Sequence, residues 1–447
     1  MKAYLLLFLI GLAINTAYSQ IEDISENTFY TDSTFTTLCN GNFSWKYENG
    51  QIGESATYLN GKIHGEYISY NEEGKLNYTA FYLYGELEGE TIWYYENGKI
   101  HFKSLYKKGL LIGESIYYNT NYELELKETY SNNQLNGPSI SFYPNGSIKE
   151  KKNYKDDLLQ GEGLSYYLNG KIKQSIFYVN DEPNGVCTSY FENGGIQNTS
   201  TYKNDEIEGK SIWYYENGQI SSVTNYQQGK QIGEYISYFR NSNIESKGQY
   251  KNGQISGEWC YYDSLKHLTS KKNYINGLQT GLDLKYYLNG KIREKRTYLN
   301  SEVVGDVILN YENGKIFEKS HYVHNLIQDT LFRYYPNGKI ASKLKYNKGI
   351  LEGISTWYYK NGKVFFSAHY ERNLLQGEFI SYHKNGIISS KGHYSNDLLQ
   401  GEYSTFYKNK TVSFKAFYHK GIITKDAMEY DSKGIKKPLI DPKCINK

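Results

Sequence analysis

One stretch of 24 residues decides the fold, and it reads GETIWYYENGKIHFKSLYKKGLLI over residues 89–112. With Gly89 as position 0, the stretch has Asn-Gly at positions 8 and 9 and another glycine, Gly109, at position 20. Asparagine and glycine accept a positive φ at little cost, so both places favour a tight reversal of the chain. The segments between them are rich in Tyr, Phe, Ile and Trp, which favour strands. The stretch therefore predicts one β-hairpin.

The pattern returns every 24 residues over residues 41–424, without insertion or deletion, which makes sixteen units. Position 0 is glycine in every unit except one, where Asp329 replaces it, and position 17 is always tyrosine. Asn-Gly occupies positions 8 and 9 in eleven units. A fixed period with two turn signals indicates stacked hairpins. We expect an all-β protein, an elongated, twisted, single-layer antiparallel sheet built from sixteen 24-residue hairpins, roughly 150 Å long.

The two faces of such a sheet depend on the loop between its strands. Positions 3, 5, 11 and 17 are mostly Ile, Leu or Tyr, and we expect them to form one apolar face if a three-residue loop or a bulge sets the alternation. A two-residue loop would reverse that alternation, and the sequence leaves both open. The alternative fold is a parallel β-helix, which would have to bury about sixteen tyrosines in a narrow lumen and needs no two-residue reversing turns.

The composition excludes several classes of protein. The chain has 447 residues, 51 Lys+Arg and 48 Asp+Glu, a net charge of +3 that is too balanced for a nucleic-acid binder working by bulk charge. An aromatic content of 16%, with 50 Tyr, argues against disorder. Lysine recurs at position 14 and glutamate at position 1, which predicts a solvated face with offsetting charges.

The first residues predict export. Met1-Lys2 precedes an apolar run over residues 4–13, and Ala17-Tyr18-Ser19 supplies the small residues of a cleavage site before Gln20. We therefore expect a signal peptide over residues 1–19 and a periplasmic, cell-surface or secreted protein. Residues 20–40 and 425–447 are expected to cap the array at its two ends, the second as a partial repeat followed by a tail.

The sequence offers no set of residues with catalytic or metal-binding spacing. Cys39, Cys187, Cys260 and Cys444 lie too far apart along a hairpin ribbon to pair by disulfide. His321 and His324 lie three apart at the end of a strand, so their side chains should point to opposite faces. We expect neither enzyme activity nor a cofactor or metal.

Aromatic residues of the first strand of each hairpin are the best candidates for binding. Four of the five tryptophans stand at position 4 and one at position 2, and position 6 is often tyrosine. If positions 2, 4 and 6 share the face opposite the tyrosine of position 17, they form an exposed strip suited to protein or glycan contact, although such rings also hold a single-layer sheet together. The candidate residues are Trp45, Trp93, Tyr95, Trp213, Tyr215, Trp259, Trp357 and Tyr359.

The motif Gly-Glu-x-x-x-Tyr-Tyr-x-Asn-Gly-Lys-Ile, as in residues 89–100 with Tyr106 following, resembles the MORN-repeat variant family. The resemblance covers nearly the whole chain after residue 40. It implies a repeat-built β-hairpin ribbon that acts in binding. Bacterial relatives are often labelled antitoxin components of toxin–antitoxin modules, and eukaryotic MORN proteins are linked to membranes and to protein scaffolding. Departures from the motif occur at Asp329, at Leu265-Lys266 and at Asn121-Tyr122.

These observations favour an exported, non-enzymatic repeat scaffold that binds another protein through an aromatic sheet face. One alternative is an antitoxin or immunity component that neutralises a toxin. The other is a protein that binds glycans or a membrane surface. The sequence does not identify the partner.

Overall fold

A computed structural model describes residues 21–23, 28–30, 38–425 and 427–437. The predicted signal peptide and the end of the C-terminal tail lie outside these residues. All regular structure in the described part of the chain is β-strand. No helix among these residues has the length and apolar character needed to cross a membrane. The chain divides into two compact units, residues 1–208 (unit 1) and 209–447 (unit 2), and each is described by itself.

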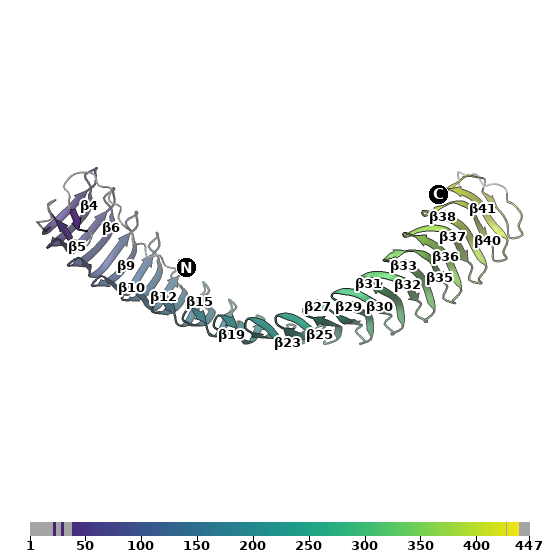
Figure 1. Cartoon of the computed structure of the whole chain (residues 1–447), viewed down its shortest axis with the longest axis horizontal. Coiled ribbons are helices and arrows are strands. Elements are labelled where there is room, and N and C mark those ends of the chain that lie inside the picture. The colour runs from purple at the N-terminus through teal and green to yellow at the C-terminus, as the bar shows by residue number, and fades with distance from the viewer. Residues whose placement is uncertain (1–20, 24–27, 31–37, 426, 438–447) are drawn as a thin grey trace. The chain divides into compact units, whose positions relative to one another are not determined.

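Unit 1 holds a small strand pair and an antiparallel sheet of hairpins whose strands follow one another in chain order (Figure 1). The strands are β1 (Ile21–Asp23), β2 (Thr28–Tyr30), β3 (Gly41–Lys46), β4 (Ile52–Leu59), β5 (Lys62–Tyr70), β6 (Leu76–Leu83), β7 (Glu86–Leu87), β8 (Gly89–Tyr94), β9 (Ile100–Lys107), β10 (Leu110–Tyr118), β11 (Leu124–Ser131), β12 (Gln134–Phe142), β13 (Ile148–Lys155), β14 (Leu158–Leu159), β15 (Gly161–Tyr166), β16 (Ile172–Val179), β17 (Glu182–Pro183), β18 (Gly185–Tyr190), β19 (Ile196–Lys203) and β20 (Glu206–Ile207). In the described part of unit 1, β3 pairs with β4 alone, so this sheet is open at that edge.

Unit 2 repeats the same antiparallel arrangement. Its strands are β21 (Gly209–Tyr214), β22 (Ile220–Gln227), β23 (Lys230–Tyr238), β24 (Ile244–Lys251), β25 (Gln254–Tyr262), β26 (Leu268–Ile275), β27 (Leu278–Gln279), β28 (Gly281–Tyr286), β29 (Ile292–Leu299), β30 (Glu302–Asn310), β31 (Ile316–Val323), β32 (Leu326–Tyr334), β33 (Ile340–Asn347), β34 (Ile350–Leu351), β35 (Gly353–Tyr358), β36 (Val364–Glu371), β37 (Leu374–Tyr382), β38 (Ile388–Ser395), β39 (Leu398–Leu399), β40 (Gly401–Phe406), β41 (Val412–His419), β42 (Ile422–Ile423) and β43 (Met428–Glu429).

The pairing confirms the predicted hairpins and excludes a parallel β-helix. In all sixteen hairpins the residue at position 0 lies directly opposite the tyrosine at position 17, as Gly89 does opposite Tyr106. Asp329 keeps the same register, because it lies opposite Tyr346 with a φ of 66°. The glycines at position 0 also have positive φ, and most have open space around them, so backbone conformation selects glycine there.

The two turns of each hairpin differ. At positions 19 and 20 both residues have positive φ, as at Asn252 (52°) and Gly253 (80°), which is the two-residue type I′ turn. At positions 8 and 9 only position 9 has positive φ, and a bulge follows. In the hairpin of β8 and β9, Tyr94 lies opposite Ile100 and Trp93 lies opposite Phe102, so position 12 is the extra residue.

The position of this bulge corrects the predicted faces. Because the bulge lies next to the turn, it affects only position 11, which comes to the same face as positions 3 and 5. The register of the rest of the hairpin is unchanged. Positions 0, 2 and 4 therefore lie opposite 17, 15 and 13, as Gly353, Ser355 and Trp357 do opposite Tyr370, Ala368 and Phe366. We call the side that carries positions 2, 4, 13, 15 and 17 the tyrosine face, and the other side the lysine face. The expectation that the tyrosine of position 17 shares a face with positions 3, 5 and 11 was wrong.

The tyrosine face takes the place of a core. Small side chains at positions 2 and 15 are buried between larger ones at positions 4, 13 and 17. Thr91 and Ser104 form one such buried pair, and Ser355 and Ala368 form another. Small residues on this line bring the larger rings of neighbouring strands into contact, which stabilises a sheet that has only one layer.

Candidate functional site

The candidate tyrosines at position 6 hold neighbouring hairpins together. The hydroxyl group of Tyr95 donates a hydrogen bond to the carbonyl oxygen of Tyr118 in the next hairpin, at 2.7 Å. Tyr215 bonds to Tyr238 at 2.6 Å and Tyr359 bonds to Tyr382 at 2.7 Å in the same way. Because these hydroxyl groups are already used within the fold, the role that the structure gives these three tyrosines is mainly structural.

Asparagine at position 8 makes a second link between neighbouring hairpins. The Asn97 Oδ1 accepts a bond from the backbone N–H of Lys99, and its Nδ2 donates to the carbonyl oxygen of Thr120 in the next hairpin. The Lys99 Nζ donates to the next carbonyl oxygen, that of Asn121. The Asn-Gly-Lys sequence therefore serves both the turn and the stacking of turns, and only the first of these roles was predicted.

Trp93 lies in a row of aromatic rings on the tyrosine face of unit 1. The row runs across five strands, β5, β6, β8, β9 and β10, and its members are Tyr67, Tyr78, Trp93, Phe102 and Tyr117. Successive ring centroids lie 5.9, 4.4, 5.8 and 5.4 Å apart. Trp93 is 38% exposed. This row, which we call the aromatic row, is a surface of contiguous rings rather than a set of isolated side chains.

Several rings of the aromatic row stack on one another. The planes of Trp93 and Phe102 differ by 16°, and those of Phe102 and Tyr117 by 25°. Stacked rings cover each other's faces and leave their edges for other contacts. A sugar ring binds best to an open aromatic face, so the arrangement is better suited to contact with side chains and peptide groups.

The other candidate tryptophans share the tyrosine face but differ in exposure. Trp45 is 54% exposed and Trp213 is 45% exposed, and Trp213 lies opposite the small Ser222. Trp357 is half-buried and stacks on Phe366, with ring centroids 4.1 Å apart. The structure brings these tryptophans to the same face as the tyrosines of position 17, not to the opposite face that the sequence suggested.

Trp259 belongs to the packing of the sheet. It is only 5% exposed, and its indole N–H donates to the carbonyl oxygen of Gln249 at 3.3 Å. The ring fills the space where a side chain at Gly248 would stand, since a Cβ there would meet it at 2.2 Å. Tyr235 stacks on the ring, with centroids 5.5 Å apart. A glycine at position 15 opposite an aromatic at position 2 is the sequence signal of such a pocket, and it recurs at Gly392 with Tyr403.

A cluster of charged residues interrupts the tyrosine face in unit 2. Asp283 and Glu294 are buried, and Lys285 and Arg296 form ion pairs with Glu294. Burial is the largest single cause and disfavours the charged form of Arg296, but Glu294, Tyr298 and Tyr322 together outweigh it, so the pKa of the guanidinium is raised. This cluster was not predicted from the sequence, in which its only signal is charge at positions 2, 4, 13 and 15.

The lysine face carries offsetting charges. Lysines at position 14 pair with acidic residues at position 1 of the same hairpin, as Lys271 does with Glu258 at 2.9 Å and Lys319 with Asp306 at 2.9 Å. These pairs are exposed and contribute little to stability. They agree with the prediction of a solvated face.

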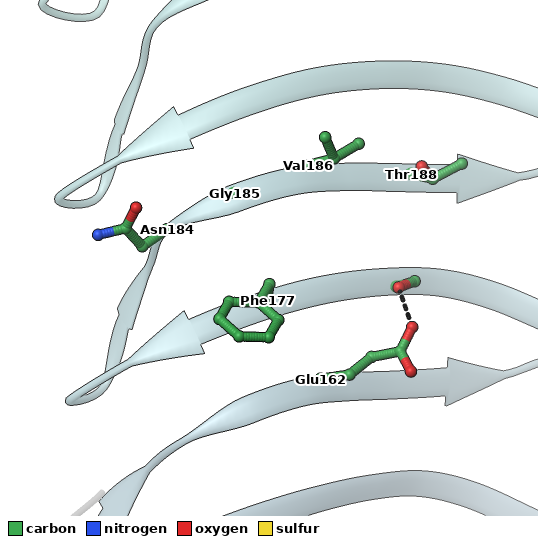
Figure 2. A pocket seen from close by; sticks show the side chains of 7 residues that line it. Glu162, Phe177, Asn184, Gly185, Val186 and Thr188 are labelled. Atoms are coloured by element: carbon green, nitrogen blue, oxygen red, sulfur yellow. Dashed lines mark hydrogen bonds between the residues drawn. The ribbon is translucent and has the colours of Figure 1, made fainter.

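The lysine face also has a shallow depression between two neighbouring hairpins of unit 1. Figure 2 shows Val186 and Thr188 on one of these hairpins and Phe177 and Glu162 on the other, where Glu162 accepts a hydrogen bond from Ser175 at 2.8 Å. The depression is open and has one charged side chain in its lining, Glu162.

The cysteines and histidines among the described residues do not come together into a site. Within the described ranges, no group of three or more His, Cys, Asp or Glu residues is arranged to hold a metal ion. His321 pairs with Asp306 and His324 with Glu302, so each histidine has an acidic neighbour of its own. Burial raises the pKa of the Cys187 and Cys260 thiols, which lowers their reactivity. Cys444 lies outside the described residues.

The repeat matches a known family model, the MORN repeat variant, in twelve segments that together cover more than half of the chain. The matched residues are 63–84, 87–108, 135–156, 159–180, 183–204, 207–228, 231–252, 279–300, 304–324, 330–348, 351–372 and 375–396. The chain belongs to the MORN repeat variant family. The four hairpins outside the match begin at residues 41, 113, 257 and 401, and the last three lack the glycine at position 9 of this MORN repeat.

Other comparisons add little to this assignment. No curated protein matches the chain. The crystal structure of TcdB2-TccC3-Cdc42 is 9% identical and aligns 88% of this chain with 30% of its own, at a TM-score of 0.14. The crystal structure of TcdB2-TccC3-TEV is 11% identical and aligns 90% of this chain with 24% of its own, at a TM-score of 0.15. The chain thus spans less than a third of the length of either, and these scores carry no argument.

Proposed function

We propose that this MORN-repeat chain is an exported, non-enzymatic scaffold that binds another protein through its tyrosine face. Export rests on the signal-peptide pattern of residues 1–19. The binding role rests on one observation above all, the aromatic row with the partly exposed Trp93 at its centre.

The chemistry of the aromatic row favours a protein partner. Contiguous aromatic surface that stays partly exposed is typical of interaction sites, and Tyr and Trp are enriched in protein interfaces. The planes of Trp93, Phe102 and Tyr117 are stacked, which leaves the edges of these rings to contact apolar side chains and peptide carbonyl groups. Glycan binding, which depends on open ring faces, has less support.

A non-enzymatic role is part of the proposal because several charged groups of the tyrosine face form ion pairs with one another. Lys152 pairs with Glu150 at 2.9 Å, and Arg333 pairs with Glu318 at 2.9 Å. Groups held in such pairs serve the sheet and are poorly placed to act on a substrate.

The test is affinity capture with residues 20–447 as bait, from the envelope fraction and the culture medium of the source cell, followed by mass spectrometry. One dominant captured protein is expected. A bait with Trp93→Ala and Trp213→Ala should lose it, because both side chains are exposed on the tyrosine face. The matched control is Phe177→Ala with Val186→Ala, which removes exposed apolar side chains from the lysine face and should retain the partner.

Two results would contradict the proposal. One is an empty capture, which would favour glycan binding, to be tested on a glycan array, or a role without a partner. The other is equal capture by both variant baits, which would remove the tyrosine face from the binding site. Circular dichroism of each bait shows whether a loss of capture is caused by loss of the fold. If the captured protein is a toxin whose activity the chain suppresses on co-expression, the scaffold role gives way to an immunity role.

A further inference from the structure

A row of exposed apolar side chains follows one turn edge of unit 2. Position 21, the residue after the type I′ turn, is apolar in five consecutive hairpins, and these side chains are 39% to 71% exposed. They are Leu326, Ile350, Leu374, Leu398 and Ile422. In the other eleven hairpins position 21 is Lys, Glu or Gln, except at Leu110, Leu158 and Leu278. The repeat therefore does not require an apolar residue there.

The row lies on the lysine face, away from the proposed binding surface. Leu374 pairs with Glu371 at position 18, which directly follows the position-17 tyrosine, and successive residues of a strand point to opposite faces. Two strands per hairpin place the five side chains about 10 Å apart in a regular line. An uninterrupted exposed apolar line of this length is typical of an interaction site.

We propose that this row is a dimer interface, in which two copies of the chain pair antiparallel about a two-fold axis at Leu374. The spacing of the row is uniform, so a rotation of 180° about Leu374 places each apolar residue of a second copy opposite an apolar residue of the first. Leu374 then meets Leu374 of the second copy, and Ile350 meets Leu398. A two-fold interface uses the same patch on both copies, which a row centred on one residue provides.

The charges beside the row support this pairing. The same two-fold axis brings Lys348 to the turn that holds Asp397 of the second copy. Both side chains are exposed. This complementary contact occurs twice in the dimer, so two ion pairs flank the apolar line. An aligned, parallel pairing would instead set Lys348 against Lys348.

The interface should be weak. Five turn tips bury less than the roughly 1,600 Å² of a standard interface, and exposed ion pairs add little. The dimer should therefore form at high protein concentration and weaken as salt is added. It does not depend on the proposed function, because the tyrosine face stays free in it.

The test is sedimentation velocity of the chain over a range of concentrations in reducing buffer, which excludes disulfides through Cys444. A concentration-dependent monomer–dimer equilibrium is expected. Leu374→Lys places two cations at the centre of the interface and should raise the dissociation constant about tenfold or more. Leu158→Lys is the matched control, since Leu158 holds the same repeat position in unit 1 and is 40% exposed, and it should leave the equilibrium unchanged.

A charge exchange tests the orientation. Lys348→Glu alone should weaken the dimer, because the new carboxylate meets Asp397 of the second copy. Adding Asp397→Asn, which keeps the side-chain oxygen that accepts the Leu375 N–H, should restore it. A chain that stays monomeric at every concentration overturns the proposal, and so does a dimer that is indifferent to Leu374→Lys. A dimer that loses affinity equally with Leu374→Lys and Leu158→Lys also overturns it. Circular dichroism and thermal melting confirm that each variant is folded.

Discussion

Tyrosines of the tyrosine face are held in their neutral form. Burial, the largest cause, raises the pKa of Tyr67, Tyr78, Tyr130 and Tyr261 well above the usual value. Nearby carboxylates act in the same direction, since Glu54 faces Tyr67, and Glu128 accepts a hydrogen bond from the Tyr130 hydroxyl at 2.7 Å. A ring whose hydroxyl must stay protonated ties the stability of the sheet to pH.

The first prediction is that the free energy of unfolding falls as the pH rises above about 10. Below that pH, folded and unfolded tyrosines are both protonated, and these groups add no pH dependence. Above it, unfolded tyrosines lose a proton that the folded ones keep, and the slope is about 1.4 kcal/mol per pH unit for each such tyrosine. Urea unfolding at several alkaline pH values measures it, and Tyr78→Phe should make the slope shallower by about one proton. An unchanged slope in Tyr78→Phe would show that this ring ionises normally.

At the scale of the hairpin, the turn at positions 8 and 9 shows how much variation the repeat tolerates. Position 9 is glycine in twelve units, and in the other four a side chain occupies the same left-handed conformation. These residues are Tyr122, Ser242, Lys266 and Lys410, with φ between 64° and 75°. The left-handed conformation costs residues other than glycine roughly 1–2 kcal/mol. Tyr122, Lys266 and Lys410 belong to three of the hairpins that the family model leaves out. The strand pairing of these hairpins is nevertheless unchanged.

The second prediction is that Lys266→Gly stabilises the protein by roughly 0.5–1 kcal/mol, because glycine removes the strain but gains entropy in the unfolded chain. Thermal melting or urea unfolding measures the change. Tyr122→Gly should gain less, since it also removes a ring stacked on Tyr118 with centroids 4.7 Å apart. Gly290→Lys, in a unit that has the glycine, should destabilise by a similar amount. A loss of stability in Lys266→Gly would mean that the lysine makes a contact worth more than the strain.

The register of the hairpins marks the limit of what the sequence could predict. The period, the two turns and the antiparallel pairing all follow from residues that repeat, such as Gly89, Asn97 and Tyr106. The side on which Tyr106 lies does not, because it depends on where the bulge sits, and no residue type marks position 12: it is Gly53, His101 and Phe365 in three of the units. The split between structural Trp259 and exposed Trp213 depends on the residues opposite each ring, which become known only with the register.

At the scale of the whole chain, each hairpin contacts mainly its neighbours. The pairing between strands of adjacent hairpins repeats with the same register, as between Lys151 and Leu164 and between Lys271 and Leu284. The links from Tyr359 to Tyr382 and from Asn97 to Thr120 also reach only the next hairpin. Repeat proteins of this kind have a stability that sums over units and their interfaces. A unit should therefore be removable if the register survives.

The third prediction tests this directly. Deletion of residues 137–160, one whole repeat, joins hairpins that begin at residues 113 and 161 and recreates the same pairing, so the shortened chain should fold with nearly unchanged circular dichroism per residue. Deletion of residues 137–148 removes most of the first strand of this repeat and the turn after it, but leaves most of the second strand, β13. In its native direction β13 runs parallel to β11, with which it would now have to pair. That variant should lose several kcal/mol or fail to fold, because antiparallel pairing, both links and the tyrosine face are broken at the junction. Equal stability of the two deletions would show that the 24-residue hairpin is not the unit of this sheet.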